Sequence, residues 1–151
     1  MTAAVTMLLA TAGCSREAGP AAFEPTQVKL RFDERIARCN TVHSLTLPQA
    51  VLRRYDLVAD EDTAELSCSL QMADGTPGNV PARIAGTATS LVGTTTPLDF
   101  KEILEERAVS YVTTFDLTAR SEVRFDIQIT DEQTGKDYAI EFSQVELPGR
   151  R

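Results

Sequence analysis

The chain of 151 residues has no tryptophan, one histidine and three cysteines, and it has fewer basic than acidic side chains. Its 15 Lys and Arg against 22 Asp and Glu give a net charge of −7. This balance argues against a nucleic-acid-binding protein, which needs a basic face to neutralise phosphates. No apolar run reaches the roughly 18 residues of a membrane-spanning helix. Apolar residues at 42% and charged residues at 25% are ordinary for a single globular domain.

Motifs of catalysis and cofactor binding are also missing. The chain has no GxSxG nucleophile elbow, no phosphate-binding loop and no dinucleotide fingerprint. His43 precedes Ser44, but a catalytic triad also needs a third group that orients the histidine, and an oxyanion hole. The consecutive acids at residues 60–62 lack the ligand spacing of a calcium loop. We therefore assign His43 to the surface or to packing, and we expect no catalytic residue, metal site or cofactor.

The first 13 residues form a short apolar segment without a charged side chain, and Cys14 follows it. Such a segment is too short to span a membrane and is typical of a secretory signal. A cysteine directly after the small pair Ala12 and Gly13 is typical of bacterial lipoproteins, in which the thiol is acylated and the signal is cut before it. We expect residues 1–13 to be a lipoprotein signal peptide and Cys14 to carry the lipid. A signal that is cleaved without lipidation is the alternative.

The other two cysteines, Cys39 and Cys68, remain as a pair once Cys14 is lipidated. An exported protein with an odd cysteine count leaves one thiol over, and lipidation accounts for it. We expect Cys39 and Cys68 to form a disulfide, which requires an oxidising compartment such as the periplasm. Two buried reduced thiols are the alternative, and two cysteines with one histidine do not make a four-ligand zinc site.

Residues 14–25 are rich in alanine, glycine and proline and show no periodicity. This composition predicts a flexible, lipid-anchored tether in front of the folded domain. Ser15 after the lipidated cysteine resembles the pattern that directs lipoproteins to the outer membrane. We therefore expect the periplasmic face of the outer membrane as the location, with the soluble periplasm as the alternative.

From residue 26 onward, apolar and polar side chains alternate, which is the pattern of strands with one face in a core. The segments are 28–33, 64–72, 80–91 (interrupted by Gly86), a short strand from Leu98, 109–117, 123–129 and 138–142. Turn signals lie at 74–78, 93–97 and 131–136. About seven strands at this spacing predict an all-β fold, an antiparallel β-sandwich or barrel, over residues 26–148.

One segment, residues 47–58, departs from the alternation. Leu47, Val51, Leu52 and Tyr55 follow helical spacing, and Pro48 suits a first helical turn. We predict a short helix that covers one end of the sandwich and serves packing.

One set of positions has the residue types and spacing of a known family. They are Leu47 to Tyr55, Leu57, Gly86, Leu91, Gly93, Leu98, Phe100, Glu102, Ile103, Ala108, Tyr111, Phe115, Phe125, Ile127, Phe142 and Gln144. Over roughly residues 26–147 the chain thus resembles the domain of unknown function family 4426, a family of exported bacterial proteins. The resemblance implies one immunoglobulin-like β-sandwich and no assigned activity. The likeness to immunoglobulins is architectural only, because the cysteine spacing and the lack of tryptophan do not match an antibody core.

The chain departs from that family pattern at a few positions. Asp56 stands where the family usually has glycine, and Ala59 and Asp60 stand where an arginine-serine pair is usual. The three cysteines look like additions. A function that depends on the arginine-serine pair is therefore not expected here.

A tethered sandwich without a catalytic set predicts a non-enzymatic module of the cell envelope. We expect contact with the membrane through the lipid on Cys14 and a protein or envelope component as partner, for example through an added strand at a sheet edge. One alternative is a small hydrolase with paired carboxylates, which requires a pocket holding two acids with shifted pKa values. Another is a carrier of a small apolar ligand between the sheets, which a close-packed interior would exclude.

Overall fold

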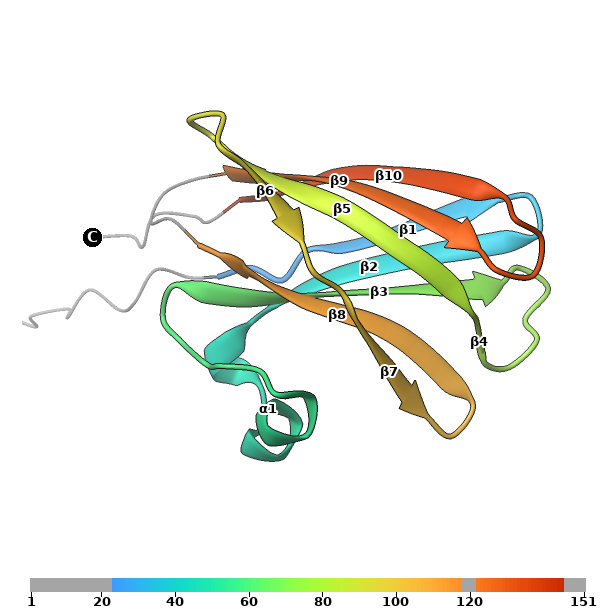
Figure 1. Cartoon of the computed structure of the whole chain (residues 1–151), viewed down its shortest axis with the longest axis horizontal. Helices are drawn as coiled ribbons and strands as arrows, with labels where there is room; N and C mark the ends of the chain where they lie inside the picture. The colour runs from blue at the N-terminus through green and yellow to red at the C-terminus, as the bar shows by residue number, and fades with distance from the viewer. Residues whose placement is uncertain (1–22, 118–121, 146–151) are drawn as a thin grey trace, which may run out of the picture.

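The computed structural model describes residues 23–117 and 122–145. Within these residues the chain forms ten strands, one helix and a short 3₁₀ turn (Figure 1). The strands are β1 (Gln27–Phe32), β2 (Arg35–His43), β3 (Thr63–Met72), β4 (Asn79–Val80), β5 (Ala82–Ser90), β6 (Thr95–Leu98), β7 (Lys101–Glu105), β8 (Ala108–Asp116), β9 (Glu122–Asp131) and β10 (Asp137–Val145). The predicted signal peptide, Cys14 and most of the tether lie outside the described residues and stay predictions.

Two antiparallel sheets lie face to face, which confirms the predicted all-β sandwich (Figure 1). The larger sheet has the order β1-β2-β3-β8-β7, with the short β4 paired to β3, and the smaller sheet has the order β10-β9-β5-β6. Ten strands replace the predicted seven for three reasons. β2 was not predicted, Pro81 separates β4 from β5, and the strand expected from Leu98 is two strands, β6 and β7. Residues 95–97, expected in a turn, belong to β6.

β2 could not be predicted from the sequence because its inward side chains are small or polar. Burial alternates along it as in any half-buried strand, and Arg35, Ala37, Cys39 and Thr41 face inward. Alternation of hydropathy, the usual signal of a strand, is therefore hidden although the alternation of burial is complete.

The sheets enclose a core of aliphatic and aromatic side chains. Phe125 of β9 lies at its centre with no exposed surface, and its ring centroid is 4.8 Å from that of Phe115 and 4.9 Å from that of Phe142. Leu66, Leu70, Ile129 and Ile140 are also fully buried. These residues occupy the positions at which the alternating pattern predicted inward side chains.

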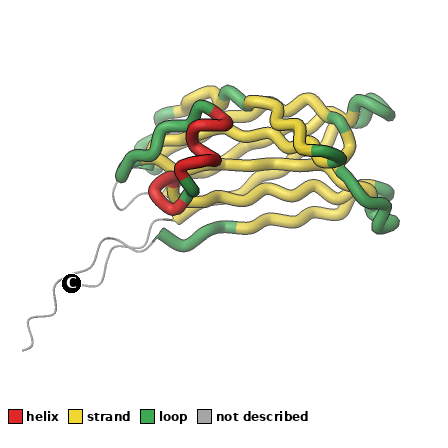
Figure 2. The backbone as a smooth tube through the Cα atoms, turned by 90° about the horizontal axis from the view of Figure 1, so that it is seen from below, coloured by secondary structure: helices red, strands yellow, loops and turns green. Residues whose placement is uncertain are grey.

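The helix α1 (Gln49–Tyr55) is shorter than the predicted 47–58 and lies against the larger sheet (Figure 2). Pro48 is its N-cap, and Asp56 ends it in the left-handed conformation, with φ 52° and ψ 49°. Glycine adopts this conformation without strain, and aspartate tolerates it better than most residues. The glycine that the resemblance leads us to expect at this position would adopt this conformation freely, and Asp56 is a workable replacement. Among the described residues no helix has the length and apolar character to cross a membrane.

The strand registers place both ends of the described chain at one end of the sandwich. Ser90 at the end of β5 pairs with Val123, and Val123 pairs with Gln144 near the end of β10. The start of β1 and the end of β2 lie at this same end, as does the β5–β6 hairpin (Figure 1). We call it the terminal end. The β1–β2, β7–β8 and β9–β10 turns lie at the opposite, distal end.

Candidate functional site

A groove opens between the two sheets along the side where the smaller sheet ends in β6. β6 pairs with β5, whereas β7, which begins three residues after β6 ends, pairs with β8 of the other sheet. The chain thus passes from the smaller sheet to the larger sheet between β6 and β7. β6 and β8 do not pair with each other, and they stay separated near the terminal end. The resulting groove has a volume of about 550 Å³.

The groove is mainly apolar. Its floor is formed by Ala88 of β5, Phe115 of β8 and Val123 of β9, which are 8%, 5% and 4% exposed. Leu91 and Val92 stand at its rim and are exposed. The remaining lining residues are Ser90, Thr94, Thr96, Pro97, Leu98, Thr114 and Asp116. This volume lies in the range of small-molecule sites, and the lining suits an apolar group rather than an ion.

The rim belongs to the tight β5–β6 hairpin. The Gly93 N–H donates to the Ser90 carbonyl at 2.8 Å, and the Thr94 N–H donates to the Ser90 hydroxyl at 3.2 Å. Gly93 has φ 86°, which explains glycine at this position. Leu91 and Val92 lie at the corner of the turn, where small or polar residues are usual.

A second, smaller hollow of about 290 Å³ lies on the outer face of the larger sheet beside α1. It contains Glu65, which is 9% exposed, and burial raises the pKa of this carboxyl. Glu105 also lines the hollow, but it accepts a hydrogen bond from the Tyr55 hydroxyl and lies 3.5 Å from Arg54. The hydrogen bond to Glu105 raises the pKa of Tyr55. Glu105 is thus already bound to Tyr55 and Arg54. Glu65 and Glu105 therefore do not form a free acid and base.

The residues considered for catalysis make local contacts instead. His43 Nε2 donates to the Glu61 carbonyl at 3.1 Å, and its Nδ1 accepts from the Leu45 N–H at 3.2 Å. Ser44 donates to the Asp60 carbonyl at 2.8 Å and is fully buried. His43 and Ser44 therefore do not form a nucleophile and base. In residues 23–117 and 122–145 no three His, Cys, Asp or Glu side chains are grouped as metal ligands.

Cys39 and Cys68 form a disulfide in the structure. The two residues are direct partners in the β2–β3 register, with Cα atoms 4.2 Å apart, and both side chains are buried. The bond therefore joins neighbouring strands of one sheet and does not bridge the two sheets. It shares the core with the apolar cluster described above.

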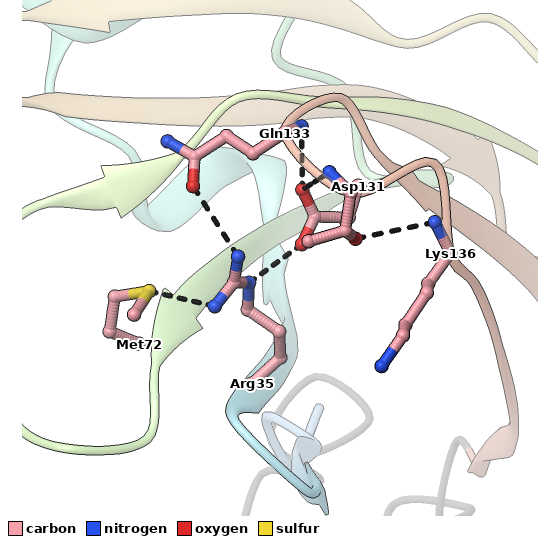
Figure 3. A network of polar contacts seen from close by, with 6 residues as sticks. Arg35, Met72, Asp131, Gln133 and Lys136 are labelled. Carbon is pink, nitrogen blue, oxygen red and sulfur yellow. Dashed lines mark hydrogen bonds and ion pairs between the residues drawn. The ribbon is translucent and has the colours of Figure 1, made fainter.

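A buried ion pair that the sequence did not reveal connects the sheets at the distal end (Figure 3). Arg35 Nε of β2 donates to Asp131 Oδ2 of β9 at 2.6 Å, and the two side chains are 5% and 0% exposed. Arg35 also contacts Met72 Sδ at 2.8 Å and Gln133 Oε1 at 3.3 Å. Asp131 Oδ1 accepts the N–H groups of Gln133 and Thr134 at 2.8 and 3.2 Å. Burial acts to raise the pKa of Asp131, but these hydrogen bonds outweigh it and lower the pKa below its usual value.

A second polar contact joins the sheets nearer the terminal end. The Thr41 hydroxyl of β2 donates to Gln144 Oε1 of β10, and both residues are buried. Gln144 Nε2 in turn donates to the Glu24 carbonyl at 2.8 Å, and the Thr26 N–H donates to Thr41 at 2.9 Å. Gln144 thereby fixes the entry of the chain into β1.

Sequence reasoning missed the groove, the ion pair and the Thr41–Gln144 contact. One signal for the groove and its rim was present. Residues 84–98 contain no charged side chain, in a chain of which 25% is charged. An uncharged hairpin in such a chain indicates a surface that contacts an apolar partner and not only water. No comparable signal marks the two polar contacts, because their partners are 96 and 103 residues apart.

Comparison with solved structures shows the same fold in three of them. A DUF4426 family protein of Pseudomonas aeruginosa PAO1 has a TM-score of 0.70 and 22% identity, covering 82% of this chain and 97% of that protein. FetP of a uropathogenic Escherichia coli strain has a TM-score of 0.57 and 13% identity, covering 86% of this chain and 100% of that protein. A copper-bound variant of FetP has a TM-score of 0.55 and 15% identity, covering 83% of this chain and 100% of that one.

Among curated proteins, none is recognisably similar to this chain in sequence. A family model does match, described as a domain of unknown function, DUF4426, and the match covers residues 29–146. It spans nearly the whole sandwich, including the strands that bound the groove. The chain belongs to the DUF4426 family.

Proposed function

We propose that this chain is a non-enzymatic binding protein of the bacterial cell envelope, held at the periplasmic face of the outer membrane by a lipid on Cys14. Its binding site is the groove between β6 and β8. The observation that carries the proposal is the open volume of about 550 Å³ above the apolar floor of Ala88, Phe115 and Val123. The interior of a sandwich is normally close-packed, so an opening of this size and polarity suits a ligand.

An export location is supported by two further observations. The disulfide between Cys39 and Cys68 is a bond that persists in oxidising compartments such as the periplasm. One of the structures with the same fold is that of FetP expressed in the periplasm of Escherichia coli. Copper, which a FetP variant binds, is not part of the proposal because the described residues do not group three metal ligands.

The occupant that the groove favours is a small apolar molecule or an apolar side chain of a partner. The free edge of β6 borders the groove, and an extended segment could pair with that edge and place a side chain on the apolar floor. An ionic ligand is disfavoured because Asp116 is the only charged residue that lines the groove among the described residues.

Binding can be tested with a neutral fluorescent probe, N-phenyl-1-naphthylamine, in titrations of the purified protein. Ala88→Met fills the groove from its floor and should abolish most of the emission gain. Ala85→Met is the matched control, because Ala85 lies on the same strand but is exposed outside the groove. Equal emission from both variants and the natural protein would exclude the groove as the site.

The anchor is tested separately in cells. We expect labelled palmitate to enter the protein and the protein to sediment with outer membranes. Cys14→Ser should abolish both. A protein that carries no palmitate and stays in the soluble periplasmic fraction would contradict the lipid anchor while leaving the groove intact.

A further inference from the structure

We infer that the tip of the β5–β6 hairpin is a membrane contact, which inserts Leu91 and Val92 into the lipid surface to which the chain is tethered. This inference rests on the proposed lipid anchor for its choice of partner, and on the hairpin itself for its geometry. It names a surface of the protein that is separate from the floor of the groove.

The first observation is the exposure of the tip. Leu91 and Val92 are 69% and 88% exposed at the corner of a turn closed by the Gly93 N–H and the Ser90 carbonyl. Neither side chain contributes to the core cluster. Apolar residues at a turn corner cost solubility and provide no packing there, which points to an apolar partner outside the protein.

The second observation is charge. Residues 84–98, which contain most of β5, the tip and all of β6, have no ionisable side chain, whereas the chain as a whole has a net charge of −7. A charged hairpin would lose hydration when it entered the interface of a bilayer. Serine and threonine, which surround the tip, can stay hydrogen-bonded among lipid headgroups.

The third observation is the position of the tip relative to the anchor. The hairpin lies at the terminal end, where the described chain begins at Phe23 (Figure 1). Eight residues lie between Cys14 and Phe23, and a fully extended chain from one to the other reaches at most about 30 Å. A lipid on Cys14 therefore holds this end of the sandwich close to the bilayer, whereas the distal end faces away.

Exposed apolar side chains gather at this same end. Large exposed apolar residues in the described part of the chain are Leu30, Leu45, Val58, Leu91, Val92, Leu104 and Val145. Four of them, Leu45, Leu91, Val92 and Val145, belong to segments of the terminal end, and Leu104 lies near the distal end. The acids at residues 60–62, just before β3, are also at the terminal end. This acidic turn favours a zwitterionic over an anionic lipid surface.

The absence of tryptophan from the chain allows a direct test with one fluorophore per variant. Val92→Trp places the reporter at the tip, and Leu104→Trp places the control at a residue of similar exposure, 71%, near the distal end. The protein, purified with its natural amino terminus, is reconstituted into phosphatidylcholine vesicles with and without brominated acyl chains. We expect blue-shifted emission and quenching by brominated lipid for Val92→Trp, and neither for Leu104→Trp.

A second variant tests the cause. Leu91→Ser in the Val92→Trp chain removes one apolar side chain from the interface, and we expect the docking equilibrium to fall about tenfold, seen as a loss of quenching. Vesicles of anionic lipid at low salt should also weaken docking. Quenching that is equal for the two reporters, or absent from both, would overturn the inference, as would tighter docking to anionic vesicles.

Two other results are distinguishable from these. A blue shift of Val92→Trp that needs no vesicles and grows with protein concentration would assign the tip to a second copy of the chain and overturn the membrane assignment. The mass of the amino-terminal peptide reports the lipid on Cys14 independently. A protein without that lipid would refute the anchor, while a blue shift on adding excess vesicles would still support the hairpin contact.

Discussion

Replacing Asp131 by asparagine would remove one charge from the buried ion pair while keeping the size of the side chain. Asp131 has no exposed surface, and its Oδ2 is 2.6 Å from Arg35 Nε. The amide oxygen of asparagine can still accept the N–H groups of Gln133 and Thr134, as Oδ1 does now. The substitution therefore removes the charge and the acceptor that face Arg35, and it keeps the acceptor of the β9–β10 turn.

The expected loss follows from the charge that is left behind. Removing one partner of a buried pair leaves the other charge uncompensated and costs about 3–5 kcal/mol. Because the amide oxygen of asparagine stays with the turn N–H groups, its NH2 faces the Arg35 Nε–H as a second donor, and we expect the high end, about 5 kcal/mol. Domains of this kind have a total stability of about 5–15 kcal/mol, so the loss is a large fraction. Combining Arg35→Met with Asp131→Asn leaves no buried charge. The destabilisation of the double variant should therefore be smaller, by about 1 kcal/mol or more, than the sum of the two single destabilisations.

Urea unfolding followed by circular dichroism measures these differences, because the chain has no tryptophan for fluorescence. Glu141→Gln is the matched control. It breaks a pair with Arg124 of similar type but at 3.5 Å and with side chains 57% and 67% exposed, and exposed pairs contribute about 1 kcal/mol at most. If Asp131→Asn cost no more than Glu141→Gln, the reasoning that burial gives the pair its importance would be refuted.

The same pair gives a dependence on pH with a defined sign. The pKa of Asp131 is lower in the folded protein than its ordinary value of about 3.9. Its contribution to stability is therefore present above the ordinary pKa and is lost as the pH falls through the folded pKa. The difference in unfolding free energy between the natural protein and Asp131→Asn should be constant near neutral pH and shrink below about pH 4.

Three further substitutions test other parts of the structure. Cys39→Ala with Cys68→Ala opens a loop of 29 residues, and the loss of loop-closure entropy predicts about 3.5 kcal/mol of destabilisation in urea unfolding; an unchanged midpoint would contradict this. Glu65→Gln should raise the unfolding free energy at pH 7 by about 1 kcal/mol, because burial penalises the carboxylate. Since the pKa of Glu65 is raised, the gain should vanish as the pH falls toward 4, and a gain that persists in acid would refute the cause. Gly86→Ala puts a Cβ 2.6 Å from Ile127 Cδ1 and 2.9 Å from a backbone oxygen, so thermal unfolding should show a loss of about 1–3 kcal/mol; a neutral effect would mean that β5 and β9 can separate.

The strands could be predicted from sequence where the core side chains are apolar. The inward residues of β3, β8, β9 and β10 alternate with polar ones, and all four strands lie close to their predicted ranges. β2 could not be predicted in this way, because two of its inward residues, Arg35 and Thr41, find polar partners in the other sheet. A polar residue can be buried when it is hydrogen-bonded, and the sequence does not show which distant residue supplies the bond.

The groove was beyond sequence reasoning for a different reason. It depends on where the chain leaves one sheet for the other, between Leu98 and Lys101, and a single strand was expected there. Its floor residues Phe115 and Val123 look like any other core positions in the alternating pattern. Only the separation of β6 from β8 leaves an open groove beside them, and this separation is a property of the assembled sheets.

The contacts between the sheets are distributed unevenly, and this has a consequence for binding. Polar links hold β2 against β9 and β10, through Arg35 and Asp131 at the distal end and through Thr41 and Gln144 toward the terminal end. The disulfide fixes β2 to β3 between these links. The opposite side, where β6 faces β8, contains the groove and has neither an inter-sheet ion pair nor a disulfide among the described residues. One buried hydrogen bond does link the sheets on this side, from the Ala82 N–H of β5 to the Tyr111 hydroxyl of β8 at 2.8 Å, and it lies toward the distal end. A ligand that widened the groove near the terminal end would therefore strain neither the ion pair nor the Thr41–Gln144 contact.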